Sequence, residues 1–242
     1  MGKKKEFDRP VGAKPNAAKS PWQKMTLPIA KRYDCEYLNE SFDLPPEVET
    51  MPLFQDWASG KLQNRIASPF WEGYIPKKKQ KWLDIGCGIS FLIYPWRDWN
   101  ALFYGQDVSA AARDILKQRG PQLNSKLFKD VTLGGAHQLP HDDAFFDGIV
   151  ATGWSCYYEF DYMKQAIAEM KRVLQPKGTL LLDILNPDSE LAEDWAILET
   201  YLGAEVMLPS LEDWHQLIRE AGGKRVKTKS GPLFDLVLIR FS

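Results

Sequence analysis

Short apolar runs and stretches of helical periodicity alternate along the chain from residue 81 onward. The apolar runs have the length of β-strands and cover residues 81–85, 102–106, 146–151, 179–185 and 234–241. Between them, apolar side chains recur every three to four residues, which predicts helices over 109–119, 161–174 and 211–221. Strands that alternate with helices in this way favour an α/β fold, doubly wound around a mostly parallel sheet with both faces covered.

Residues that start or stop helices set the predicted ends of these elements. Ser109 and Asp161 are predicted N-caps, and the Gly120-Pro121 pair is predicted to stop the first helix. The Pro176-Lys177-Gly178 sequence predicts a turn between the second helix and the strand that follows it. A weaker strand is predicted over residues 126–129.

The N-terminal part differs in composition from the rest of the chain. Residues 1–20 are rich in lysine and poor in large apolar side chains, which is typical of a flexible basic tail. Residues 21–76 carry many aromatic side chains interrupted by prolines. We interpret them as a helical extension of short helices and loops that packs as a lid on the α/β domain of residues 77–242, because so many rings need burial.

The composition is that of an ordinary globular protein. The 31 basic and 32 acidic residues leave a formal net charge of −1, so nothing calls for a nucleic acid partner. The apolar runs are too short to span a bilayer, and no apolar stretch follows the basic N-terminus as in a secretory signal. Three widely spaced cysteines fit a reducing compartment, so we expect a cytoplasmic protein without a membrane partner. The sequence does not indicate an oligomeric state.

A glycine turn, Gly86-Cys87-Gly88, follows the first strand and begins two residues after Asp84. Glycines at the carboxyl end of a strand let the backbone approach a ligand. Asp107 ends the next strand, where a carboxylate can accept hydrogen bonds from both hydroxyls of a ribose. Asp84 would repel the pyrophosphate of a nicotinamide dinucleotide, which makes a dehydrogenase a poor alternative. The pattern favours a nucleoside ligand that carries positive charge and no phosphate.

Four segments in this part of the chain follow the order of motifs in one known family. They are Asp84-Ile85-Gly86-Cys87-Gly88, Gly105-Gln106-Asp107-Val108-Ser109, residues 137–150 and residues 169–178. Together they resemble motif I, the acidic loop after strand two, the entry to strand four, and the helix and turn before strand five of the class I S-adenosylmethionine-dependent methyltransferases. The resemblance implies a seven-stranded sheet with an antiparallel last strand, S-adenosylmethionine as cofactor, and methyl transfer.

The resemblance also implies roles for single residues around the cofactor. The residues implied to contact the cofactor begin at its methionine end, continue to the ribose and adenine, and end near the methionyl carbons. In that order they are Asp84, Gly86, Cys87, Gly88, Asp107, Val108, Ala136, His137, Thr152 and Gly153. One position departs from the family, since Gly135 stands where an acidic residue often reaches the adenine amino group. Asp130 from a longer loop, His137 or the backbone could serve instead.

The acceptor pocket is predicted between the loop of residues 153–158 and the aromatic segment of residues 30–75. Trp154 and Tyr157 are the predicted substrate-binding residues, because the loop follows the fourth strand of the motif order and a pocket of aromatic rings suits a flat or apolar small molecule. Simple core packing of the same rings is the competing interpretation. The loop lacks the Asn-Pro-Pro-Tyr motif, which argues against amino methylation of nucleobases.

Several alternatives stay open at this point. The basic tail leaves room for a methyltransferase of protein or RNA, and a protein that binds the cofactor without catalysis would show the same motifs. Arsenite methylation through Cys35, Cys87 and Cys156 is disfavoured, because nothing in their spacing brings them together. The three histidines lack metal-ligand spacing, so no metal site is predicted. Methyl transfer from a sulfonium requires no particular base motif, so we assign no catalytic residue.

Overall fold

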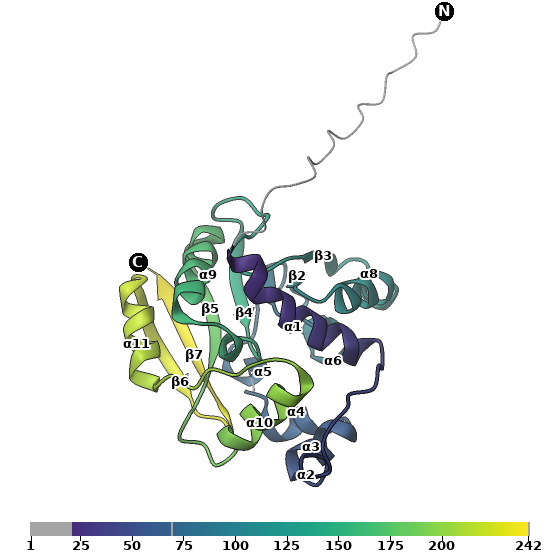
Figure 1. Cartoon of the computed structure of the whole chain (residues 1–242). Helices are drawn as coiled ribbons and strands as arrows, with labels where there is room; N and C mark the ends of the chain where they lie inside the picture. Colours follow the sequence, from purple (N-terminus) through teal and green to yellow (C-terminus); the bar gives the residue numbers. More distant parts are fainter. Residues whose placement is uncertain (1–20, 69, 242) are drawn as a thin grey trace, which may run out of the picture.

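The structure is a computed structural model that describes residues 21–68 and 70–241, and the tail predicted over residues 1–20 lies outside these described residues. Within them, seven strands form a single sheet in the order β3-β2-β1-β4-β5-β7-β6 (Figure 1). The strands are β1 (Lys81–Ile85), β2 (Leu102–Asp107), β3 (Phe128–Leu133), β4 (Phe146–Ala151), β5 (Leu174–Leu185), β6 (Gly223–Lys229) and β7 (Phe234–Phe241).

The strand directions place a ligand-binding crevice at the centre of the sheet. Strands β1 to β5 are parallel to one another, while β7 is antiparallel to both β5 and β6. The chain order reverses at β1, since β2 and β3 lie on one side and β4 and β5 on the other. Open α/β sheets bind ligands at the carboxyl ends of the strands beside such a reversal. The predicted doubly wound, mostly parallel seven-stranded sheet with an antiparallel last strand is confirmed.

Helices that follow β1 cover both faces of the sheet. They are α6 (Ser90–Ile93), α7 (Trp96–Trp99), α8 (Ala110–Asn124), α9 (Phe160–Val173), α10 (Ala192–Leu202) and α11 (Leu211–Glu220), with a 3-10 turn η1 (Ser155–Tyr157). Successive strand residues point to opposite faces. Leu83 therefore belongs to the core that includes side chains of α9, α10 and α11, whereas Trp82 belongs to the core that includes those of α6, α7 and α8.

Several predicted element ends differ from the observed ones. Helix α8 continues through Gly120-Pro121 to Asn124, because Gly120 lacks a side chain and lets the ring of Phe128 pack against the helix. Strand β3 spans Phe128–Leu133 and not residues 126–129. Helix α9 begins at Phe160 with Glu159 as its N-cap, so Asp161 lies in the first turn. Ser109 is the N-cap of α8, as predicted, and accepts a hydrogen bond from the Ala112 amide at 3.0 Å.

The N-terminal extension consists of helices that pack on the sheet domain. They are α1 (Pro21–Tyr37), α2 (Pro46–Glu49), α3 (Pro52–Ala58), α4 (Leu62–Ile66) and α5 (Phe70–Gly73). Helix α1 lies beside α8 (Figure 1). The predicted helical extension is confirmed, and its separation from residues 77–242 as a distinct domain stays a prediction. In the part of the chain that the structure describes, no helix is long and apolar enough to cross a bilayer.

Candidate active site

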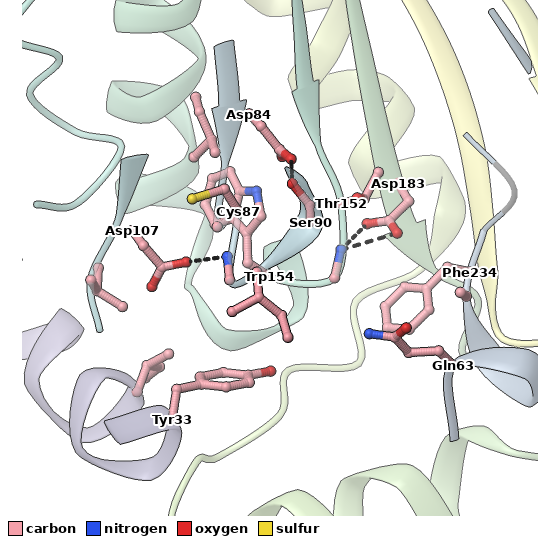
Figure 2. A pocket seen from close by; sticks show the side chains of 18 of the residues that line it. Tyr33, Gln63, Asp84, Cys87, Ser90, Asp107, Thr152, Trp154, Asp183 and Phe234 are labelled. Carbon is pink, nitrogen blue, oxygen red and sulfur yellow. Dashed lines mark hydrogen bonds between the residues drawn. The ribbon is translucent and has the colours of Figure 1, made fainter. Parts of the chain in front are cut away.

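A cavity of about 440 Å³ lies at the carboxyl ends of β1, β2, β4 and β5, against the helices of the N-terminal extension (Figure 2). The glycine turn and the loops after β2, β3 and β4 line one side, and α1 and α4 line the other. The structure brings most of the predicted site residues to this cavity, namely Asp84, Gly86, Cys87, Gly88, Asp107, Val108, Ala136, Thr152, Gly153 and Trp154.

Two aromatic side chains lie directly on the glycine turn. Gly86 and Gly88 have φ angles of +67° and +47°, which residues with a Cβ rarely adopt. A Cβ on Gly86 would come within 2.8 Å of Cδ1 of Trp154, and a Cβ on Gly88 would collide with the hydroxyl of Tyr37. The glycines therefore make room for Trp154 from the loop after β4 and for Tyr37 from α1.

Asp84 is a buried carboxyl at the base of the cavity. Its side chain accepts a hydrogen bond from the Ser90 hydroxyl (Figure 2). Burial raises the pKa of Asp84 to about 7, and the hydrogen bond from Ser90 acts in the opposite direction. No ion pair to Asp84 is present within residues 21–68 and 70–241. A buried acid without a positive partner suits a ligand that brings positive charge.

Asp107 ends β2 and is oriented by two backbone groups. Its carboxylate accepts hydrogen bonds from the amides of Gly88 at 2.7 Å and Ser109 at 2.8 Å. Burial raises the pKa of Asp107, and these backbone hydrogen bonds act against the rise. A carboxylate offers about four acceptor positions, so Asp107 keeps capacity for hydroxyl groups of a ligand in the cavity.

The loop after β3 has no room for an acidic side chain at residue 135. A Cβ on Gly135 would come within 2.7 Å of both Nδ1 of His137 and the hydroxyl of Tyr162. The loop is held instead by Gln106, whose side-chain amide donates to the Gly135 carbonyl at 2.9 Å. Gln106 is buried and lines the cavity, so an amide and backbone groups are the polar groups at this part of the wall.

Three side chains considered from the sequence do not line the cavity. Asp130 is half exposed on β3 and pairs with Lys117 at 3.3 Å, so it does not reach the site from a longer loop. His137 points its Nδ1 at the Tyr162 hydroxyl, 3.5 Å away, and stays outside the lining. Tyr157 is buried behind the cavity wall, where its hydroxyl bonds to other protein groups. These placements correct the expected contacts of His137 and Tyr157.

Trp154 is both a packed side chain and part of the cavity lining. It is 7% exposed, belongs to the hydrophobic core and also lines the cavity. The two interpretations from the sequence, a pocket residue and a core residue, therefore both apply to it. Its buried Nε1–H has no hydrogen-bond partner in the described part of the chain. An unpaired buried donor of this kind costs about 1–3 kcal/mol.

A buried ion pair ties α1 to α10. The guanidinium of Arg32 donates to both carboxylate oxygens of Glu199, at 2.9 and 2.7 Å. The hydroxyl of Tyr157 donates to Glu199 at 2.9 Å and lies 2.7 Å from the hydroxyl of Tyr33 on α1. Arg32 and Tyr33 line the cavity, so this network holds the helix that forms one of its walls.

A second contact ties α1 to the start of α8. The carboxylate of Asp34 accepts hydrogen bonds from the Ser109 hydroxyl at 2.7 Å and the Ala111 amide at 2.9 Å. An acid at the first turn of a helix also interacts favourably with the helix dipole. Because Ser109 follows the loop of Asp107 and Val108, the contact fastens α1 over the part of the cavity near the end of β2.

Sequence reasoning missed several polar residues of the site. Tyr37, Ser90, Gln106 and Asp183 line the cavity, and Glu199 supports it from α10. Asp183 and Glu199 were detectable in principle, because each is a lone acid within an apolar stretch. No local sequence pattern marked Tyr37 as a site residue, because the glycine turn that it contacts lies about fifty residues further along the chain.

Comparisons with known proteins identify a described domain in the middle of the chain. Residues 83–182 match a protein family described as a methyltransferase domain. Phthiotriol/phenolphthiotriol dimycocerosates methyltransferase 1 of Mycobacterium ulcerans (strain Agy99) is 32% identical over 121 residues. This alignment covers 46% of the present chain and 40% of that protein, so the chain spans less than half of the relative's length.

Solved structures with low sequence identity share the fold. Geranyl diphosphate C-methyltransferase from Streptomyces coelicolor A3(2), in complex with Mg²⁺, geranyl diphosphate and S-adenosyl-L-homocysteine, superposes with a TM-score of 0.64 at 12% identity, covering 93% of this chain and all 100% of that one. A SAM-dependent methyltransferase from Aquifex aeolicus gives a TM-score of 0.55 at 16% identity, covering 82% and 98%. At these identities the likeness concerns the fold.

Proposed function

We propose that the chain, whose residues 83–182 match a methyltransferase domain, is a class I S-adenosylmethionine-dependent methyltransferase that transfers the methyl group to a small, largely apolar acceptor. One observation carries this proposal. A single cavity is lined both by the glycine turn with Asp84 and Asp107 and by aromatic side chains such as Tyr33 and Trp57 from the N-terminal extension. Cofactor and acceptor would then meet inside one enclosure.

The residues at the sheet side of the cavity fit S-adenosylmethionine. Its ammonium and sulfonium groups supply the positive charge that buried Asp84 lacks. Asp107 would hold the ribose hydroxyls, Val108 would pack on the adenine, and Gln106 with the nearby backbone would face the adenine edge. His137 is not retained in this proposal, because it lies outside the lining.

The protein's own contribution is enclosure and alignment. When bound, S-adenosylmethionine supplies a methyl group that its sulfonium already activates. Holding two reactants in line can account for a large part of a rate enhancement. Helix α1 would act as the lid, fastened by Asp34 at α8 and by the Arg32–Glu199 pair at α10. Ligand entry then requires these contacts to open.

The relatives support an apolar acceptor. The Mycobacterium ulcerans protein is named for phthiotriol and phenolphthiotriol dimycocerosates, and the Streptomyces coelicolor enzyme for geranyl diphosphate. Both compounds carry long apolar portions, and the aromatic lining of the present cavity suits such a molecule. We also propose a cytoplasmic location, which the three free cysteines support.

Replacing Asp107 with alanine is expected to weaken adenosylhomocysteine binding by roughly 10- to 100-fold, because the lost carboxylate would accept charged hydrogen bonds worth about 1.5–3 kcal/mol each. Calorimetry measures the affinity, and a melting curve checks the fold. Asp130→Ala is the matched control, since Asp130 is an exposed acid outside the cavity and its loss should leave the affinity unchanged. Equal affinity in Asp107→Ala and the parent protein would exclude the assigned ribose contact.

The acceptor class is tested by incubating the protein with methyl-labelled S-adenosylmethionine and fractionated cell extract. We expect the label in a small, organic-extractable compound. Label in protein or RNA would contradict the small-molecule proposal. Cofactor binding without label in any fraction would identify a binding protein that has lost catalysis.

A further inference from the structure

Asp183 is a third buried carboxyl in the cavity wall, after Asp84 and Asp107, and none of the proposed cofactor contacts uses it. It lies near the end of β5 and is 2% exposed. Its carboxylate accepts hydrogen bonds from the Gly153 amide, at 2.9 and 3.1 Å, and from the Ser68 hydroxyl at 3.0 Å. In Figure 2 it lies on the side of Phe234 and Gln63, away from Asp107.

Apolar side chains line the same cavity as Asp183. They include Ile66, Trp195 and Phe234, and among the described residues no lysine, arginine or histidine pairs with Asp183. A carboxylate has about four acceptor positions, so the bonds from Gly153 and Ser68 leave capacity for a ligand donor. A hydrogen-bond acceptor in an apolar wall selects a ligand with one donor on an apolar body.

We propose that Asp183 binds the methyl acceptor through a hydroxyl group, so that the acceptor is an apolar alcohol or phenol. The inference rests on the proposed function. A hydroxyl fits better than a protonated amine, because the nitrogen of an ammonium has no lone pair with which to accept a methyl group. The bond from Gly153 places this carboxylate beside the loop of Thr152 and Gly153, where the methionyl carbons of the cofactor are proposed to lie.

The protonation state of Asp183 gives the proposal a pH dependence. Burial raises the pKa of Asp183 to about 7, and the bonds from Gly153 and Ser68 act in the opposite direction. Two titratable groups interact with the charge of Asp183, namely Tyr94 and Cys156. Burial raises the pKa of Tyr94 to about 12 and also raises the pKa of Cys156. Both stay neutral near pH 7. The carboxylate that accepts two or more donors is therefore present above pH 7 and lost as the pH falls below it.

A pair of isosteric probes measures the hydroxyl contact directly. Benzyl alcohol and ethylbenzene differ by one hydroxyl in place of a methyl group, and their dissociation constants are measured by NMR titration at pH 8 on protein saturated with adenosylhomocysteine. The ratio of the ethylbenzene constant to the benzyl alcohol constant is expected to fall about tenfold in Asp183→Asn, which corresponds to one lost charged hydrogen bond. Asp235→Asn is the matched control, because Asp235 is buried on β7 and does not line the cavity.

Each outcome decides the proposal. An unchanged ratio in Asp183→Asn, an equal fall in Asp235→Asn, or no binding of either probe overturns it. If Asp183→Asn does not fold, the parent protein is titrated at pH 8 and pH 5.5, where the ratio is expected to fall at the lower pH, and a constant ratio overturns the proposal. Failure to bind adenosylhomocysteine at all would instead overturn the proposed function, which separates the two failures.

Discussion

Replacing Glu199 with alanine is expected to lower the free energy of unfolding by about 3–5 kcal/mol, because the buried guanidinium of Arg32 then keeps only its ion pair with Glu36. Glu199 is fully buried, Arg32 is 3% exposed, and the two share two hydrogen bonds. Tyr157 would lose its acceptor in the same variant. Denaturation by urea, followed by circular dichroism, measures the change.

A double variant distinguishes the effect of the unpaired charge on stability from the effect of the smaller side chain. Replacing both charges, as in Arg32→Met with Glu199→Leu, should cost less than Glu199→Ala alone, since a buried pair exchanged for apolar groups is often close to neutral. Glu212→Ala is the control, because Glu212 forms an exposed pair with Arg219 and its loss should change stability little. A Glu199→Ala protein as stable as Glu212→Ala would mean that α1 is not fastened to α10 in solution.

The Gly86→Val variant is expected to lose at least about 100-fold in adenosylhomocysteine affinity. A β-branched residue at a φ of +67° is strained by about 1–3 kcal/mol, and its Cβ would displace the Trp154 ring that lies 2.8 Å away. Both effects move the turn on which the cofactor is proposed to rest. Calorimetry of the purified variant measures the affinity.

The Gly203→Val variant is the control for backbone strain alone, because it introduces valine at a positive φ outside the cofactor site. Gly203 has a φ of +104° at the end of α10, no atom lies within 4 Å of a Cβ built there, and it does not line the cavity. This variant should lose stability while keeping its cofactor affinity. Retained affinity in Gly86→Val, or an equal loss in Gly203→Val, would contradict the assignment of the glycine turn.

The sheet and its glycine turn were predictable because local patterns determine them. The apolar run of residues 81–85 became β1 with the predicted bounds, and that of residues 146–151 became β4. A strand buried on both faces needs an unbroken apolar run, and the glycine turn needs residues that tolerate positive φ. Both requirements leave a signature within ten residues.

The contacts of the N-terminal extension were not predictable in this way, because they join distant parts of the chain. The prolines in residues 21–76 suggested short helices, yet α1 continues through Pro28, since burial of Ile29 and Arg32 against the domain outweighs the lost backbone hydrogen bond. Helix α10 was missed because its sequence lacks a clear polar face. The pairing of Glu199 with Arg32 could therefore be recognised only in the folded structure.

Calorimetric titration of the protein with S-adenosylhomocysteine, and separately with NAD⁺, tests the central claim most directly. Asp84 and Asp107 line a cavity that suits a positively charged nucleoside and repels a pyrophosphate. We expect binding of S-adenosylhomocysteine with one-to-one stoichiometry and no measurable heat from NAD⁺. Tight binding of NAD⁺ with no response to S-adenosylhomocysteine would contradict the account.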